Sequence, residues 1–258
     1  LVSLKHSGVG PGYRAAPQVF YFAPQKLWYL VYQGGPPLYS TTTNIEDPQS
    51  WSTPKPFFSQ TPAIVKDSGQ ESWLDFWVIC DDATCYLFNT GDNGKLYRSK
   101  TPIGRFPEGF TDTQIVITGE RDDVFEAGMH YKIAGTNTYL TAIEAIGPQG
   151  RYFRAWTSDR LDGTWRPLAD SASKSFAGSD NVKFDGPAWS EGVSHGELVR
   201  EGYDQTLTID PCKPLQFLYQ GLASHPDGTD YINLPYRLAL LTATGPNPVS
   251  RMCPQLVK

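Results

Sequence analysis

Two runs of sequence decide the fold class: Val124-Phe125-Glu126-Ala127-Gly128-Met129-His130-Tyr131-Lys132-Ile133 and Tyr139-Leu140-Thr141-Ala142-Ile143-Glu144-Ala145. Both runs are rich in β-branched and aromatic residues, which favour strands. The connection between them, Ala134-Gly135-Thr136-Asn137-Thr138, contains the Gly and Asn that are typical of a turn. The stretch therefore predicts two β-strands joined by a turn.

Glu126 is the unusual residue of this stretch, because it stands at the head of the first strand between Phe125 and Ala127. A carboxyl group among apolar neighbours has its charged form disfavoured, so its pKa is expected to rise toward the range of a general acid. The alternative is a carboxylate that pairs with a nearby Lys or Arg at the strand end. On this stretch alone the ion pair is favoured, since structural ion pairs also perturb pKa values.

Composition excludes several classes of protein. The 258 residues are 40% apolar and 13% aromatic, and the 24 Gly and 21 Pro are spread along the chain without a helical stripe, so we predict an all-β chain. A single domain over residues 1–258 is compatible with this length. The net charge of −5, with scattered basic residues, argues against nucleic acid or an anionic membrane as partner. No apolar run is long enough to span a bilayer.

The four cysteines predict disulfides rather than a zinc site. Cys80 and Cys85 enclose a short connection, as if bridging a hairpin, while Cys212 and Cys253 lie near the end. An even count without CxxC or His-rich spacing favours an oxidising, extracellular setting, so secretion is expected. The pairing of Cys212 with Cys253 is left open at this point.

Strand-turn-strand units recur along the chain and predict a β-propeller. The units start near Ala16, Leu74, Phe125 and Ser194. In the last unit the expected strands cover residues 194–199, 206–209 and 215–220. A β-sandwich is the alternative on pattern alone.

The first strands of propeller blades converge on the central axis, so their first residues are candidates for a site. These strand heads carry Pro17, Asp75, Glu126 and His195, which we interpret as equivalent repeat positions. Convergent polar groups in a concave site are typical of a binding or active site. For Asp75 the alternative is a strand-end aspartate hydrogen-bonded to a loop.

Several longer motifs resemble glycoside hydrolase family 62, the α-L-arabinofuranosidases that act on arabinoxylan. They are residues 73–80, 92–99, Phe125-Glu126, 150–154, 194–200, Asp210-Pro211-Cys212, 215–221 and 234–237. The resemblance runs in order from about Ala15 to Thr242. It implies a five-bladed β-propeller fold and hydrolysis of terminal arabinofuranosyl side groups with inversion at the anomeric carbon.

Carried over by position, the resemblance makes Glu126 the general acid and Asp75 the aspartate that raises the pKa of that acid and holds the sugar. An inverting hydrolase needs a protonated carboxyl on the leaving-group side and a carboxylate about 6.5–9.5 Å away, which leaves room for water. A negative Asp75 near Glu126 would keep the latter protonated by like-charge repulsion.

The resemblance also implies the groups that hold substrate and ion. Arg151, Tyr231 and Arg237 match substrate-binding positions, and His195 matches a histidine that helps to hold a calcium or sodium ion near the axis. No organic cofactor is expected. The implied partners are arabinoxylan and arabino-xylooligosaccharides.

The N-terminal region departs from the family pattern. The family's general base is an aspartate preceded by Lys, whereas here Lys5 is followed by His6. About four blades are visible, so the N-terminal blade is expected to be incomplete, and Leu1 is typical of a processed or partial chain. Three readings follow: an incomplete active member, a variant with another base, or a non-catalytic or impaired propeller that binds arabinoxylan. His6 can act as a base in principle, but a loop histidine without a catalytic role is favoured. A monomer is expected unless the missing blade promotes association.

Overall fold

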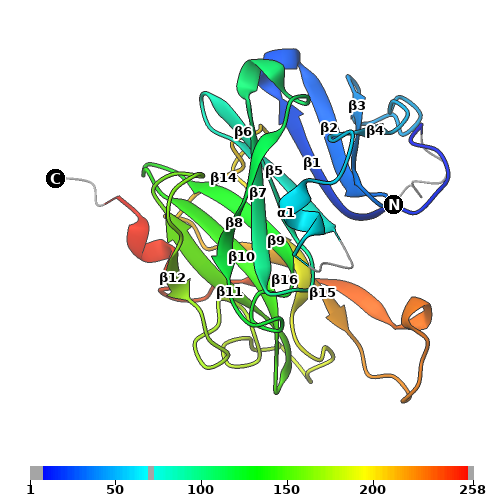
Figure 1. Cartoon of the computed structure of the whole chain (residues 1–258). Helices are drawn as coiled ribbons and strands as arrows, with labels where there is room; N and C mark the ends of the chain where they lie inside the picture. The colour runs from blue at the N-terminus through cyan, green and yellow to red at the C-terminus, as the bar shows by residue number, and fades with distance from the viewer. Residues whose placement is uncertain (1–7, 69–72, 255–258) are drawn as a thin grey trace. The chain divides into compact units, whose positions relative to one another are not determined.

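The computed structural model describes residues 8–68 and 73–254, and over these ranges the regular structure is almost entirely β-strand (Figure 1). The first sheet has the order β1 (Ala15–Phe22), β2 (Leu27–Gln33), β3 (Pro37–Thr42), β4 (Lys55–Pro56). The second has the order β5 (Leu74–Cys80), β6 (Thr84–Thr90), β7 (Lys95–Pro102), β8 (Thr111–Thr118). The third has the order β12 (Arg166–Ala169), β11 (Gly150–Ser158), β10 (Tyr139–Gly147), β9 (Glu126–Ile133), β14 (Thr208–Ile209). The fourth has the order β13 (Ser194–Leu198), β15 (Gln216–Leu222), β16 (Tyr236–Thr242).

The helical elements are single turns. They are α1 (Ala63–Lys66) and the 3-10 turns Ala23–Gln25, Ile103–Arg105, Tyr231–Asn233 and Ser250–Met252. Many Gly and Pro residues and few helix-period patterns explain why no longer helix forms in the described ranges.

The chain divides into two compact units. The first unit runs to Val124 and also takes in Gly202–Leu207, and the second unit contains Phe125–Glu201 and the chain from Thr208 onward. The returning segment Gly202–Leu207 hydrogen-bonds to both sheets of the first unit. The Tyr21 N–H donates to the Tyr203 carbonyl at 2.6 Å, and the Cys80 N–H donates to the Gln205 carbonyl at 2.9 Å.

The sequence-predicted hairpins are present, and the chain is all-β. In each sheet the main strands follow one another as an antiparallel meander, which is the topology of a propeller blade. The four inner strands begin at Ala15, Leu74, Glu126 and Ser194, beside the expected starts. Four small sheets rather than two large ones rule out the sandwich alternative over the described residues. The fifth blade that the resemblance implied is not confirmed, and the single-domain assignment stays a prediction.

The inner strand of every sheet carries a β-bulge near its start. Two residues stand opposite one of the partner strand between Ala15 and Gln18, between Leu74 and Trp77, and between Glu126 and Met129. The fourth sheet has the same irregularity between Ser194 and Gly196. A bulge bends the strand and re-aims the side chains around it. All four sheets thus have a β-bulge at the strand ends where the candidate residues lie.

Within each unit a buried polar side chain joins the inner strands of two sheets. In the first unit the Gln18 amide donates to the Val78 carbonyl and accepts from the Val78 N–H, both at 2.8 Å. In the second unit the Leu198 N–H donates to the Tyr131 hydroxyl at 2.8 Å. Both Gln18 and Tyr131 are almost fully buried, so these bonds satisfy groups that have no access to water.

Two sequence-based assignments of strands were incomplete. Residues 206–209 were expected in the last blade, but β14 pairs in parallel with Lys132 and Ile133 of β9 in the third sheet. Leu207 and Ile209 are fully buried, so the apolar run was identified correctly while its partner strand was not. The third strand of the last blade is instead β16, and the outer strand β8 was not predicted. Exposed outer strands have weak patterns, because few of their side chains face a core.

All four cysteines form disulfides, as expected in place of a zinc site. Cys80 pairs with Cys85 across the β5–β6 hairpin, and Cys212 pairs with Cys253 within the second unit. The second pairing, which the sequence left open, closes a loop of 41 residues near the end of the chain.

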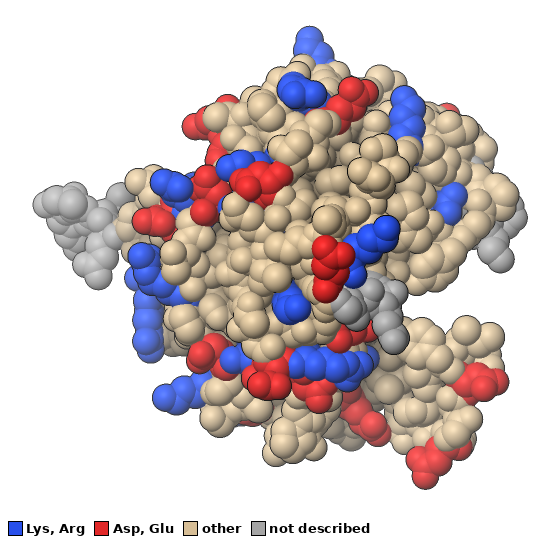
Figure 2. Space-filling model, in the orientation of Figure 1, with Lys and Arg blue, Asp and Glu red and all other residues tan. Residues whose placement is uncertain are grey.

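The distribution of surface charge and the length of the helices test whether nucleic acid or a membrane is a partner. On the face drawn in Figure 2, Lys and Arg side chains are interspersed with Asp and Glu rather than gathered into one basic patch. Among residues 8–68 and 73–254, no helix is long and apolar enough to cross a membrane.

The two disulfides should differ in their effect on stability, because loop-closure entropy grows with loop length. Replacing Cys212 and Cys253 together by serine should lower the free energy of unfolding by about 4 kcal/mol, and replacing Cys80 and Cys85 by about 2 kcal/mol. Urea unfolding followed by tryptophan fluorescence measures both. Equal losses for the two pairs would contradict the loop-length argument.

Candidate functional site

Glu126 is the first residue of β9 and lies directly opposite Glu144 of β10. The bulge follows at once, and Ala127 takes a φ of 52° within it. The Glu126 side chain is 23% exposed, whereas the Glu144 side chain has no exposed surface. Like charges directly opposite each other on neighbouring strands are destabilising, so this pair needs a counter-charge.

Arg151, the second residue of β11, supplies that counter-charge. Its Nη1 donates to Oε1 of Glu144 at 2.6 Å and also to Oε1 of Glu126. The guanidinium carbon lies 4.8 Å from the centre of the Phe125 ring, a cation–π geometry. The two carboxyl groups raise the pKa of Arg151 against the opposing effect of burial, so Arg151 stays charged.

Glu144 is a buried carboxylate whose acceptor positions are occupied. Besides Arg151, it accepts hydrogen bonds from the Ser194 hydroxyl at 3.1 and 3.2 Å and from the His195 N–H at 2.6 Å. Burial raises the pKa of Glu144, the nearby Glu126 adds to this, and Arg151 and the His195 N–H oppose it. The network therefore compensates in part for the cost of burying this charge.

A close backbone approach brings Ser194 and His195 to Glu144. Gly192 takes a φ of 82°, and a Cβ at this position would lie 2.7 Å from the N and O atoms of Arg151. The absence of a side chain lets the Val193 N–H donate to the Arg151 carbonyl at 2.8 Å. The chain then enters β13, where the Ser194 hydroxyl and the His195 N–H donate to Glu144 of β10.

The structure brings some of the sequence-predicted residues together. Glu126, Arg151 and His195 belong to one network around Glu144, all within the second unit. Tyr231 lies in a 3-10 turn and is 74% exposed, with its ring 6.5 Å from that of Tyr236. Arg237 is an exposed residue of β16 opposite Gly221. Their contact with substrate stays a prediction.

Asp75 lies in the first unit, as the second residue of β5. It is 8% exposed, takes a φ of 53° and donates its N–H to the Gln33 side-chain oxygen at 3.4 Å. A left-handed backbone at a non-glycine residue is uncommon, and Asp tolerates it better than most residues. Its pairing with Glu126 stays a prediction.

The bulges correct one inference from the sequence. Asp75 and Glu126 were interpreted as equivalent positions, but the register aligns Glu126 with Leu74 and Asp75 with Ala127. Asp75 and Ala127 are the left-handed residues of their bulges, and Glu126 immediately precedes one. The two acidic side chains therefore leave their strands from successive bulge positions and differ in direction.

Besides Ser194, which the sequence placed only at the start of a unit, two residues at this network were given no role by sequence reasoning. Glu144 interrupts the apolar run of β10, and this interruption was the available signal. Tyr236 is the other: burial raises its pKa, as do Glu144 and Glu126, while Arg151 opposes the rise, so its phenol lies within electrostatic reach of all three. The resemblance included Tyr236 in a motif but did not assign it a role.

The residues around His195 do not by themselves form a metal site. Over residues 8–68 and 73–254, no group of three or more His, Cys, Asp or Glu side chains is placed to hold an ion. The Glu144 carboxylate beside His195 is already bound by Arg151, Ser194 and the His195 N–H. A calcium or sodium ion at this position stays a prediction of the resemblance. His6, the other candidate from the sequence, lies outside the described residues.

The four antiparallel sheets are of the kind that forms propeller blades, and the partly exposed Glu126 carboxyl held by Arg151 gives this fold an acidic group at a strand head. The sequence profile of glycosyl hydrolase family 62 matches residues 7–242. The chain therefore belongs to glycosyl hydrolase family 62.

Individual relatives agree with this assignment. Alpha-L-arabinofuranosidase C from Cellvibrio japonicus (strain Ueda107) is 44% identical over 244 residues, which is 93% of this chain but only 37% of the length of that protein. The catalytic domain of a family 62 α-L-arabinofuranosidase from Coprinopsis cinerea is 51% identical, with a TM-score of 0.91 over 94% of this chain and 77% of that chain. A family 62 hydrolase solved in complex with xylotriose is 47% identical, with a TM-score of 0.89 over 93% of this chain and 77% of that chain.

Replacing Arg151 by methionine should destabilise the protein in a pH-dependent way. The variant keeps the Glu144 carboxylate buried without its counter-charge, so near neutral pH the free energy of unfolding should fall by about 3–5 kcal/mol. The pKa of Glu144, already raised by burial, should rise further, so the folded state binds a proton more tightly than the unfolded chain. The loss should therefore be smallest below the ordinary value of 4.5 and grow as the pH rises above it.

Urea unfolding of wild type and variant at matched pH values measures this loss. Arg121→Met is the control, because Arg121 pairs with Asp122 where both side chains are largely exposed, and exposed pairs contribute little. Similar losses in the two variants, or no dependence on pH, would show that Arg151 is not needed to balance Glu144.

Proposed function

We propose that this chain hydrolyses terminal α-L-arabinofuranosyl side groups of arabinoxylan by an inverting acid/base mechanism, with Glu126 as general acid. The observation that carries the proposal is the Glu126 carboxyl, which is partly exposed, stands at a strand head and is held by Arg151 beside a buried carboxylate. Two named relatives are α-L-arabinofuranosidases, and a third was solved with a xylan-type trisaccharide, which supports the substrate class.

In this mechanism Glu126 gives its proton to the glycosidic oxygen as the bond to the anomeric carbon breaks. Water attacks the same carbon from the opposite face and loses a proton to a base, which inverts the configuration. Arg151 orients the Glu126 carboxyl through Oε1, which leaves Oε2 as the oxygen that can carry the proton toward the substrate. Asp75 holds the arabinofuranosyl ring and favours the protonated form of Glu126.

The remaining parts of the proposal come from the resemblance and the disulfides. The position of the family's general base falls on His6, so the base is not assigned to a described residue. A cation near His195 would be bound by oxygen and nitrogen ligands, and no step of the proposal passes through it. The two disulfides support secretion to an oxidising environment.

Glu126→Gln tests the role of the acid. Because the amide cannot donate a catalytic proton, kcat on wheat arabinoxylan should fall by about 10²–10⁴-fold with KM nearly unchanged. The loss should be much smaller on 2,4-dinitrophenyl α-L-arabinofuranoside, whose leaving group departs without protonation. Arabinose release and dinitrophenolate absorbance measure the two rates.

Glu120→Gln is the matched control, because Glu120 is an exposed glutamate of the first unit. It should leave both rates at wild-type values. Equal losses on both substrates in Glu126→Gln would argue for a structural defect rather than loss of the acid. Binding of arabinoxylan with no arabinose release by the wild type would favour the non-catalytic alternative.

Asp75→Asn tests the second carboxylate. In the proposal Asp75 favours the protonated form of Glu126, so its replacement should move the alkaline limb of the pH profile of kcat/KM on arabinoxylan to lower pH. Initial rates over a pH series in buffers of constant ionic strength measure the shift. An alkaline limb in the wild-type position would show that Asp75 does not influence the protonation of Glu126.

A further inference from the structure

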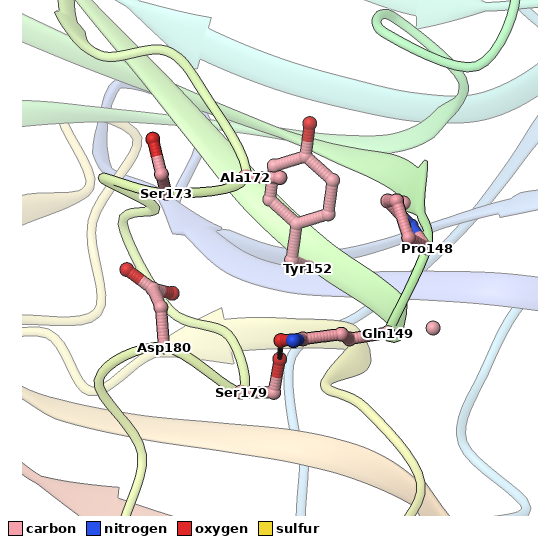
Figure 3. Close-up of a pocket in the computed structure, with 9 residues that line it drawn as sticks. Pro148, Gln149, Tyr152, Ala172, Ser173, Ser179 and Asp180 are labelled. Carbon is pink, nitrogen blue, oxygen red and sulfur yellow. Dashed lines mark hydrogen bonds between the residues drawn. The ribbon is translucent and has the colours of Figure 1, made fainter.

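A pocket of about 520 Å³ at the tip of the β10–β11 hairpin has no role in the site described above. It is lined among others by Gln149, Tyr152, Ser179 and Asp180 (Figure 3). The Ser179 hydroxyl donates to the Gln149 oxygen at 2.7 Å, and Asp180 accepts hydrogen bonds from the N–H and the hydroxyl of Ser175. Because Tyr152 is its one aromatic residue and its carboxylate is bound internally, this pocket indicates no particular ligand.

A cluster of aromatic side chains on the first unit is more informative. Tyr21 of β1 and Trp28 of β2 stand opposite each other across the hairpin, and Tyr203 joins them from the returning segment. The ring centres of Trp28 and Tyr203 lie 5.2 Å apart, and that of Tyr21 lies 5.4 Å from Trp28 and 5.9 Å from Tyr203. We call these three residues the aromatic platform.

The aromatic platform is open to solvent. Tyr203 is 62% exposed, and Tyr21 and Trp28 are each partly exposed. Phe20 and Phe22, the neighbours of Tyr21 in β1, are fully buried and supply the core contacts of this strand. Large apolar groups that are exposed side by side, rather than singly, are typical of a binding surface.

Backbone hydrogen bonds fix Tyr203 against the end of β1. The Tyr21 N–H donates to the Tyr203 carbonyl, and Tyr21 forms a parallel bridge with Asp204. The Asp204 Oδ1 atom accepts from the N–H of Thr206 at 2.9 Å and from its hydroxyl at 2.6 Å, which closes the turn. The platform is therefore formed before a ligand arrives, and little conformational entropy is lost on binding.

Within the first unit, the aromatic platform and Asp75 lie at opposite ends of the inner strands. Ala15 and Tyr21 are six residues apart in β1, which corresponds to about 20 Å along a strand. Cys80, the last residue of β5, donates its N–H to the Gln205 carbonyl of the same returning segment, whereas Asp75 is near the start of β5. A ligand on the platform is thus separate from the strand head that carries Asp75.

The platform is too small for a stable protein partner. One aromatic side chain buries about 150–250 Å², and these three rings already cover part of one another. A stable protein interface buries about 800 Å² on each partner. A ligand the size of one or two sugar rings matches the available surface.

The chemistry of the platform suits a neutral sugar ring. The C–H groups on the flat face of a pyranose carry slight positive charge, and the faces of aromatic rings are negative. The tyrosine hydroxyls and the indole N–H can pair with sugar hydroxyl groups. The Trp28 and Tyr203 rings are inclined by 32°, so they suit a soluble, twisted chain better than the flat surface of a crystalline fibre.

We propose that the aromatic platform is a second carbohydrate site, which holds a separate stretch of a soluble β-linked pyranose chain and takes no part in bond cleavage. It keeps the protein on the polymer while the reaction proceeds elsewhere. The identification of that chain as xylan rests on the proposed function, whereas the platform and its affinity for a pyranose do not.

NMR of the Trp28 indole locates the binding. In protein labelled with ¹⁵N-tryptophan, the Trp28 signal is assigned by its absence in Trp28→Phe, and it should shift when xylohexaose is added. Tyr203→Ala removes the most exposed ring, so the dissociation constant read from this signal should rise by about tenfold, as for loss of one stacking partner. The kcat and KM on 4-nitrophenyl α-L-arabinofuranoside, which has no main chain, should stay at wild-type values.

Two further variants control for the chemistry and the position of the change. Tyr203→Phe keeps the ring and should keep the dissociation constant within about twofold of wild type, since one exposed hydrogen bond contributes little. Tyr13→Ala is the matched control, because Tyr13 is a tyrosine of the first unit with 64% exposure, and it should leave the Trp28 signal and its response unchanged. Thermal unfolding at the wild-type temperature confirms that each variant is folded.

The outcomes separate the two proposals. A Trp28 signal that does not respond to xylohexaose, or wild-type affinity in Tyr203→Ala, would overturn the second site. Equal losses in Tyr203→Ala and Tyr13→Ala would also overturn it, as would retention on microcrystalline cellulose without a response to xylohexaose. Xylohexaose carries no arabinofuranosyl group, so a Trp28 response in a chain that releases no arabinose would sustain the second site and overturn the proposed hydrolysis.

Discussion

The Glu144 carboxylate has no access to solvent, so its charge has to be balanced inside the fold, and Arg151 balances it at 2.6 Å. A buried charge without a partner is among the most costly features that a fold can contain. This requirement fixes Arg151 on β11, Ser194 at the start of β13 and the facing positions of β9 and β10. The position of the Glu126 carboxyl follows from this requirement. Arg151, which is bound to Glu144, is also the group that binds Glu126.

The bulge in β9 accompanies the partial exposure of the Glu126 carboxyl. The extra residue after Glu126 lets the strand bury Met129 and Tyr131 while Glu126 keeps part of its surface in solvent. The same irregularity recurs at Ala15, Leu74 and Ser194. Placing reactive groups at bulges therefore lets one blade design serve both packing and chemistry.

The sequence predicted the hairpins well, because their strands and turns are encoded locally. Residues 126–133 and 139–147 form the two strands expected on either side of Ala134–Thr138. The sequence did not predict that β14 adds to β9 in parallel, nor that Ser194 and His195 bind Glu144 from 50 residues away. Such contacts depend on the packing of sheets, which periodicity does not encode. The one-residue offset between Asp75 and Glu126 was not predicted for a related reason. A bulge shifts the register of a strand without changing its apolar pattern.

The segment Gly202–Leu207 has a consequence for how the protein must be made. The first unit draws hydrogen bonds for Tyr21 and Cys80 from this segment, which the ribosome adds only after β9 to β13 are complete. The Tyr21 and Cys80 N–H groups therefore lack these native partners while most of the second unit is synthesised. The chain is interleaved, and no single cut between Val124 and Phe125 would release two self-sufficient pieces. The first unit can therefore complete its native hydrogen bonds only after residues 202–207 have been made, in contrast to chains whose domains mature strictly from the N-terminus.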